Sequence, residues 1–182
     1  MRRKFHAQIA EALAIHSSEL MDSQPELFAQ HYTAAGLVEK SVVWWGKAGR
    51  RSAESSSFAE AASQFQKGID QLVQLPDTSE RRQRELEFRV ALGAALRVIK
   101  GNAAPETGRA FARAQELWKQ LDYPTEFFHI PVGQVNYHAL RGELDLALRL
   151  NEELLRVSGR AERSGRAAPG SSLFRSNPNV SR

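Results

Sequence analysis

From residue 2 to residue 157, apolar residues recur every three or four positions, which is the spacing of an amphipathic helix. The first segment, for example, places Phe5, Ile9, Ala12 and Leu13 on one stripe. Sustained alternation of apolar and polar residues, which would indicate strands, is absent from the sequence. These patterns predict an all-α fold.

Short breaks divide the pattern into eight predicted helices. Pro25 and Pro105 suit the first turn of a helix, and Gly36 suits the end of one. Asp77 to Glu80 is typical of a capped helix start. Loops this short make consecutive helices antiparallel neighbours. The predicted helices cover about residues 2–16, 25–36, 37–55, 57–75, 77–101, 105–121, 125–140 (bent at Pro131) and 143–157.

Composition narrows the class of protein. A chain of 182 residues suits one domain or a short repeat array. Because it has no cysteine, a disulfide framework, a thiolate metal site and a cysteine nucleophile are excluded. No apolar stretch approaches the ~18 residues that span a bilayer, and the basic start leads into an amphipathic pattern instead of a signal peptide. We expect a soluble, cytoplasmic protein without a membrane partner.

The basic character of the chain comes from its end. The net charge is +4, yet the residues after position 155 carry six arginines and one glutamate, which leaves residues 1–155 with a net charge of −1. Residues 158–182 are rich in Arg, Gly and Ser and poor in large apolar residues, so they are predicted to form a disordered tail. A nucleic-acid partner is therefore not favoured.

Large, small and turn-forming residues recur at similar offsets within successive helix pairs, as in the tetratricopeptide repeat of about 34 residues. Trp45 and Ala48 fit two overlapping registers, so one long helix is expected to pack against both of its neighbours. We predict antiparallel helical hairpins stacked as a degenerate α-solenoid, with an ordinary helical bundle as the alternative. The residues predicted to pack the repeats are Phe28, Ala29, Tyr32, Gly36, Trp45, Ala48, Phe58, Ala61, Phe65, Gly68, Leu92, Gly93, Phe111, Ala114, Gly142 and Ala147.

Several spaced motifs resemble one bacterial protein family. Over residues 2–157 the chain is similar to the tetratricopeptide-type region of large bacterial proteins that have an AAA/STAND-type ATPase module. Many proteins of that family also carry a class III adenylate or guanylate cyclase domain. The motifs are the run from Arg2 to Leu13, the run from Gln24 to Gly36, Trp45-Gly-Lys-Ala-Gly49, Leu75-Pro-Asp-Thr78, Ala91-Leu-Gly-Ala94, Lys100-Gly-Asn-Ala-Ala-Pro-Glu106 and Arg141-Gly-Glu-Leu144.

The resemblance implies a domain organisation. Residues 1–20 would be the helix that closes the ATPase region, residues 21–157 the repeat array, and residues 158–182 have no counterpart. The family's phosphate loop and metal-binding aspartates have no matching positions here, so no catalytic, cofactor-binding or metal-binding residue carries over. Ser41 stands where the family favours alanine and Pro131 where an aromatic residue is common.

The sequence itself also lacks the pattern of a catalytic or metal site. The segment from Gly36 to Ser41 has Glu39 where a phosphate loop needs its second glycine. The five histidines lack a metal-binding spacing, so they are predicted to be surface or packing residues. We expect no cofactor and no metal.

Three local features are assigned roles on helix surfaces. Glu85 and Glu87 are predicted to lie on a solvated face, and the arginines from Arg81 to Arg84 to form ion pairs along their helix. Trp44 and Trp45 are adjacent, so only one of them is expected to face a core. Trp44 is the candidate for an exposed contact with a neighbouring domain.

Together these observations favour a non-catalytic, regulatory protein-binding scaffold, a fragment of a bacterial ATPase–cyclase signal-transduction protein. Its partner would be the ATPase or cyclase module of a parent chain, or a peptide. Two alternatives stay open, namely an RNA- or nucleic-acid-binding repeat protein and a small helical-bundle enzyme.

Overall fold

The computed structural model describes residues 2–16, 18–127 and 129–163, and its regular structure in these ranges is helical, without strands. This confirms the predicted all-α class. In the same ranges, no helix combines the length and apolarity that crossing a bilayer requires. The elements are α1 (Arg2–His16), α2 (Ser18–Ser23), α3 (Pro25–Ala35), α4 (Val38–Glu54), α5 (Phe58–Leu72), α6 (Ser79–Lys100), α7 (Pro105–Gln120), the 3₁₀ helix η1 (Thr125–Phe127), α8 (His129–Leu140) and α9 (Leu144–Arg163).

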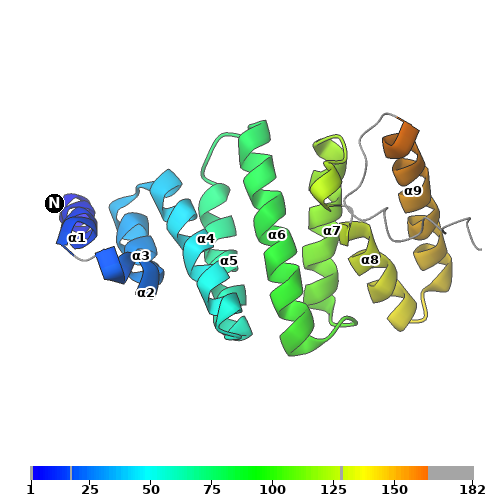
Figure 1. Cartoon of the computed structure of the whole chain (residues 1–182), viewed down its shortest axis with the longest axis horizontal. Coiled ribbons are helices and arrows are strands. Elements are labelled where there is room, and N and C mark those ends of the chain that lie inside the picture. The colour runs from blue at the N-terminus through cyan, green and yellow to red at the C-terminus, as the bar shows by residue number, and fades with distance from the viewer. Residues whose placement is uncertain (1, 17, 128, 164–182) are drawn as a thin grey trace, which may run out of the picture.

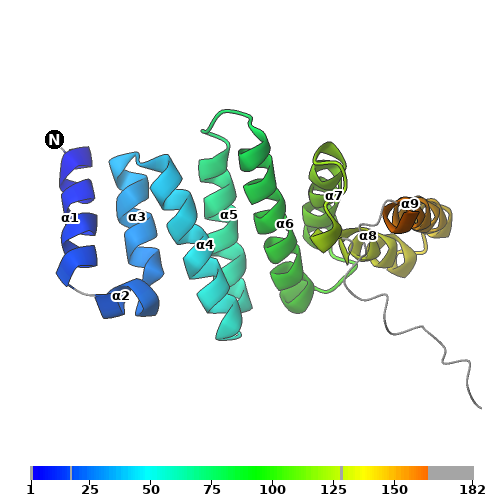
Figure 2. The same cartoon turned by 45° about the horizontal axis from the view of Figure 1, so that its top comes forward.

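The helices lie in a row that follows their order in the chain. Both Figure 1 and Figure 2 show α1 at one end of the row and α9 at the other. From α3 onward each helix packs against the next, and α1 packs against α3. The helix α4 packs on both α3 and α5, as the two overlapping repeat registers predicted.

Local chemistry sets the ends of several helices. Gly36 closes α3 and Gly142 forms the turn before α9, with φ of +75° and +77°, a region where glycine avoids the strain of other residues. The Thr78 hydroxyl accepts a hydrogen bond of 3.2 Å from the backbone N–H of Arg81 and so caps α6. The helix predicted over residues 125–140 with a bend at Pro131 instead begins at His129, after the separate 3₁₀ helix η1. Pro131 lies in the first turn of α8, where its missing N–H needs no partner.

Two sequence predictions are also wrong near the chain ends. The helix α9 continues to Arg163, so residues 158–163 are helical and do not belong to the predicted tail, whose other residues, 164–182, lie outside the described ranges. In α1, Phe5 is 67% exposed whereas Ala10 is fully buried. The small side chain of Ala10 allows α1 to lie close to α3, and this turns Phe5 toward solvent.

Among the described residues, the buried apolar side chains form three clusters along the row. The first lies between α1, α3 and α4, the second between α4, α5, α6 and α7, and the third between α6, α7 and α8. Phe28, Phe65 and Trp118 are large members of the first, second and third cluster respectively. The helices α4 and α6 each contribute to two clusters, so each of these two helices is held from both sides.

Trp44 belongs to the first cluster, which corrects the prediction that it is exposed. Only 8% of Trp44 is exposed, and its ring stacks on that of Phe28 with 4.5 Å between centroids. Trp45 is 4% exposed and its Nε1 donates a hydrogen bond of 3.0 Å to the Thr33 hydroxyl. Both indoles are buried because residues of α3 contact each of them.

Glycines opposite aromatic rings set the distance between consecutive helices. A Cβ atom added to Gly49 of α4 would lie 2.6 Å from the Phe65 ring of α5. Gly68 of α5 meets the Phe88 ring of α6 in the same way. Two further pairs continue along the row: Gly93 of α6 with Phe111 of α7, and Gly108 of α7 with Tyr137 of α8.

We expect Gly68→Ala to lower the free energy of unfolding by about 1–3 kcal/mol, because its methyl group would overlap the Phe88 ring. The matched control is Gly159→Ala in α9, where no heavy atom lies within 4 Å of the added Cβ. That change should instead stabilise the protein by about 0.5–1 kcal/mol through helix propensity. Urea unfolding measures both, and effects of the same sign would contradict the packing described.

Candidate functional site

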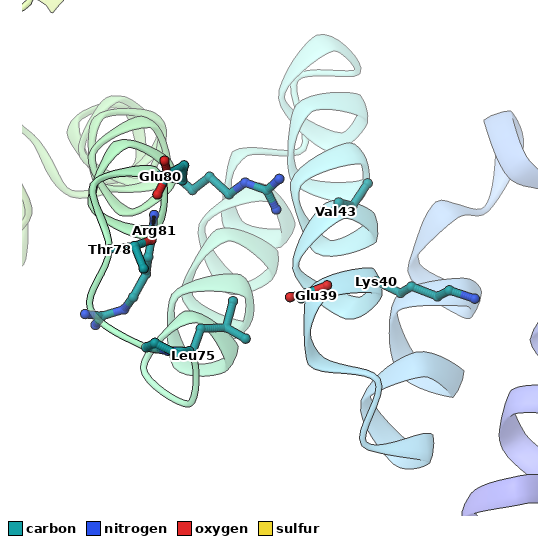
Figure 3. Close-up of a pocket in the computed structure, with 9 residues that line it drawn as sticks. Glu39, Lys40, Val43, Leu75, Thr78, Glu80 and Arg81 are labelled. Carbon is teal, nitrogen blue, oxygen red and sulfur yellow. Dashed lines mark hydrogen bonds between the residues drawn. The ribbon is translucent and has the colours of Figure 1, made fainter.

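A groove lies between α4 and α6, above the end of α5. Its volume is about 510 Å³. Phe88 brings its two walls together, because the ring contacts Gly46 of α4 as well as Gly68 of α5. Figure 3 shows the groove, which is lined by Glu39, Lys40, Val43, Leu75, Pro76, Thr78, Glu80, Arg81 and Arg84.

The α4 wall of the groove combines an apolar and an acidic side chain. Val43 is 45% exposed, although the residues on either side of it in α4, Val42 and Trp44, are buried. Glu39 stands one turn before it at the same wall, whereas Lys40 points away from the groove in Figure 3. The Lys40 ammonium instead lies 3.8 Å from the Glu11 carboxylate of α1. The wall facing α6 is therefore apolar with an acidic edge.

The α6 wall carries Glu80 and two arginines, and the two arginines differ in their partners. Arg81 is occupied, because its Nε donates to the Leu72 carbonyl at 2.9 Å and its Nη1 lies 3.0 Å from Asp77. Arg84 is exposed and forms no ion pair within the described ranges. Because Leu75 and Pro76 form apolar surface beside it, the groove offers a free cation next to an apolar floor.

Smaller grooves lie elsewhere along the row, with volumes of about 420 and 410 Å³. One lies between α3 and α5 and is lined by Thr33, Trp45 and Lys67. The Lys67 ammonium sits 4.8 Å from the centroid of the Trp45 ring and covers it. In this groove the Lys67 ammonium already interacts with the Trp45 ring, so neither group is as available to a partner as Arg84 and Val43 are in the groove between α4 and α6.

Glu85 holds α6 and α7 together and is buried, which corrects its predicted place on a solvated face. It is 3% exposed, and its carboxylate lies 3.0 Å from Arg113 of α7, 3.5 Å from Arg89 and 3.7 Å from Arg81. Burial alone would raise the pKa of Glu85, but the Arg113 hydrogen bond and the charges of the three arginines lower it below its usual value. The cluster has the features of a structural ion pair rather than of an acid–base pair.

The histidines do not converge on a metal site. Within the described ranges, no group of three or more His, Asp or Glu side chains could hold a metal ion. His6 of α1 and His31 of α3 contact each other, with 3.0 Å between their Nδ1 atoms. His138 lies 2.5 Å from Glu143 in the turn that Gly142 forms. These contacts join neighbouring helices or the two sides of a turn.

None of the sequence-predicted packing residues lines the groove. Phe28, Ala29, Tyr32, Trp45, Ala48, Ala61, Phe65, Gly68, Leu92, Gly93, Phe111, Ala114 and Ala147 are buried, Phe58 is half-buried, and Gly36 and Gly142 are exposed in turns. Sequence reasoning missed Val43. Its prediction of ion pairs along the helix holds for Arg81 and Arg82 but is wrong for Arg84. The sequence did contain a signal for Val43, because this apolar residue lies outside the row of apolar residues that forms the buried face of α4. For Arg84 the sequence contained no signal that distinguished it from the neighbouring arginines.

Replacing Glu85 with alanine should lower the free energy of unfolding by about 3 kcal/mol, because Arg113 and Arg89 would lose the carboxylate between the helices. Glu116→Ala is the matched control, since Glu116 also contacts Arg113 at 3.0 Å but is 63% exposed. It should cost less than about 1 kcal/mol. Equal losses in thermal or urea unfolding would show that Glu85 does not join α6 to α7.

Acidification should loosen α1 from α3. Burial, and then the charge of His6, lowers the pKa of His31 below its usual 6.5. Just below pH 6.5 the unfolded chain therefore binds more protons than the folded chain. The free energy of unfolding that neutral His31 contributes is fully present above pH 6.5 and declines as the pH falls. Hydrogen-exchange protection of α1 should decrease in this direction, and His31→Gln should remove much of the pH dependence. Protection that does not change with pH in the native protein would contradict this.

We compared the chain with known proteins. No family model, no curated protein and no solved structure matches it.

Proposed function

We propose that this protein is a non-catalytic scaffold that binds a segment of a partner protein in the groove between α4 and α6. The observation that carries the proposal is the pairing of exposed Val43 with the uncommitted cation of Arg84 across that groove. Exposed apolar surface beside a free charge is typical of interaction sites. Here both groups project from helices that the buried ring of Phe88 holds at a fixed distance.

The chemistry of the groove defines the partner segment. An apolar side chain would cover Val43 and Leu75, and a carboxylate a few residues away would pair with Arg84. Glu39 on the opposite wall would repel a second acid there, which sets the direction of the segment. We infer a short peptide or helix with one large apolar residue and one Asp or Glu.

We further propose that the row of helices is a degenerate tetratricopeptide-like α-solenoid. Packing of each helix on the next and the division of the core into successive clusters support this proposal. The repeated glycine–aromatic contacts from α4 to α8 also support it, since they give successive helix pairs a common packing device.

The resemblance of residues 2–157 to bacterial ATPase–cyclase proteins supplies a biological setting for the scaffold. We propose that the chain is a fragment of such a signal-transduction protein and that it contacts ATPase or cyclase modules in the cytoplasm. The contact between α1 and α3 is compatible with this role, because a helix that closes an ATPase region would be held directly on the array.

Selection from a displayed peptide library should enrich peptides that combine a large apolar residue with Asp or Glu. Val43→Glu and Arg84→Glu should each weaken binding of an enriched peptide by at least about tenfold. Val98→Glu and Arg97→Glu are the matched controls, because both residues are exposed on α6 outside the groove and should leave binding unchanged.

Purified ATPase and cyclase modules of the resembled family are the second set of probes in the same titrations. Binding that the two groove variants abolish would support the ATPase–cyclase setting. If no peptide is enriched, or if groove and control variants have equal effects, the groove is not the binding site.

A further inference from the structure

The last helix of the row, α9, has two apolar faces. One face packs inward, where Ala147 is 6% exposed and Val157 contacts the cluster that contains Trp118. The second face carries Leu144, Leu148 and Leu155, which are 60%, 62% and 64% exposed. Single exposed leucines are ordinary on protein surfaces, but an aligned series on one helix indicates a contact surface.

These leucines follow the spacing of a helix pair. Leu144, Leu148, Asn151 and Leu155 are separated by four, three and four residues, which is a heptad seam. Asn151 is exposed between two of the leucines. A single polar residue in such a seam fixes how the two helices align, because its amide bonds best to another polar group across the seam.

Charged residues form a parallel stripe beside the leucines. Asp145, Arg149, Glu152 and Arg156 are also separated by four, three and four residues, and their charges alternate. All four are exposed, and none forms an ion pair with the described residues. The guanidinium groups of Arg149 and Arg156 instead donate to the carbonyls of Asp145 and Glu152, at 3.3 Å each.

We propose that this surface binds a second copy of the chain, with the two α9 helices antiparallel about a two-fold axis. Asp145 then faces Arg156 of the partner subunit, and Arg149 faces Glu152 of the partner subunit. Both pairs are centred between residues 150 and 151, so one axis satisfies all four charges. A parallel arrangement would place the two charged stripes on opposite sides of the leucine seam, where neither pair could form, so it is disfavoured.

The alternating charges favour a second copy over residues 164–182 as the occupant. Residues 164–182 contain three arginines and no acid, so on this surface they would leave Arg149 and Arg156 facing like charge. They also contain Pro169 and Pro178, which interrupt a helical seam. A second copy has the same alternation and so matches each charge with its opposite.

Because the chain has no cysteine, single cysteine variants of the full chain report the geometry directly. Asn151→Cys lies next to the two-fold axis and should form an intermolecular disulfide under mild oxidation. Asp145→Cys should not, since the rise of a helix separates the two copies of residue 145 by about 16 Å along the axis. Equal cross-linking of both variants would overturn the antiparallel arrangement.

The strength of association is measured by analytical ultracentrifugation of the full chain. A dimer is expected at about 100 μM, and a monomer at that concentration would overturn the proposal. Leu148→Glu and Leu155→Glu should each raise the dimer dissociation constant at least about tenfold, with unchanged circular dichroism. Unchanged dissociation constants would overturn the proposal as well.

Charge reversal tests the pairing itself. Asp145→Arg and Arg156→Asp should each weaken the dimer, whereas the double variant should recover affinity because each residue again faces its opposite. A double variant as weak as the sum of the two single variants would contradict the pairing. Peptide binding in the groove between α4 and α6 should be unaffected by the α9 variants, so failure of this proposal is distinguishable from failure of the proposed function.

Discussion

The approach of a glycine to an aromatic ring on the next helix is the contact on which the arrangement of this protein depends. It occurs between α4 and α5, α5 and α6, α6 and α7, and α7 and α8. Because the glycine has no side chain, the ring can rest against the backbone and the two helix axes can lie close together. Phe88 contacts two glycines, Gly46 and Gly68, so one ring fixes α4 and α6 relative to α5. The width of the groove between α4 and α6 is therefore a consequence of core packing, and the groove exists before any partner binds.

A buried charged cluster also helps to fix the position of α6 relative to α7. Glu85 is surrounded by Arg81, Arg89 and Arg113, and the lowered pKa of its carboxyl shows that their attraction outweighs the cost of burial. A carboxylate among three guanidinium groups has one favourable position, so Glu85 adds to the register that the contact between Gly93 and Phe111 sets for α6 and α7. The same cluster holds Arg81 in place and leaves Arg84 as the cation available to a partner.

Helix positions could be predicted from the sequence because the periodicity of residues such as Phe65 and Leu92 reports one buried face. The errors occur where a residue is covered from a second direction. Trp44 was expected to be exposed because it neighbours Trp45, yet α3 buries both. Glu85 was expected on a solvated face because its arginine partner on α7 is 28 residues away. Val43 and Arg84 form one site only through the packing of α4 on α6, and periodicity within one helix contains no information about that distance.

The two proposed surfaces are compatible with one particle. The groove lies in the middle of the row, between α4 and α6, whereas the leucines of α9 lie at one end, as Figure 1 shows for these elements. Association through α9 would leave both grooves of a dimer open. Two grooves held on one particle bind a partner that carries two matching segments far more tightly than either groove alone, because the second contact forms at a high effective concentration. A shallow groove with one apolar contact and one cation would then suffice for a scaffold, since its affinity need not come from a single site.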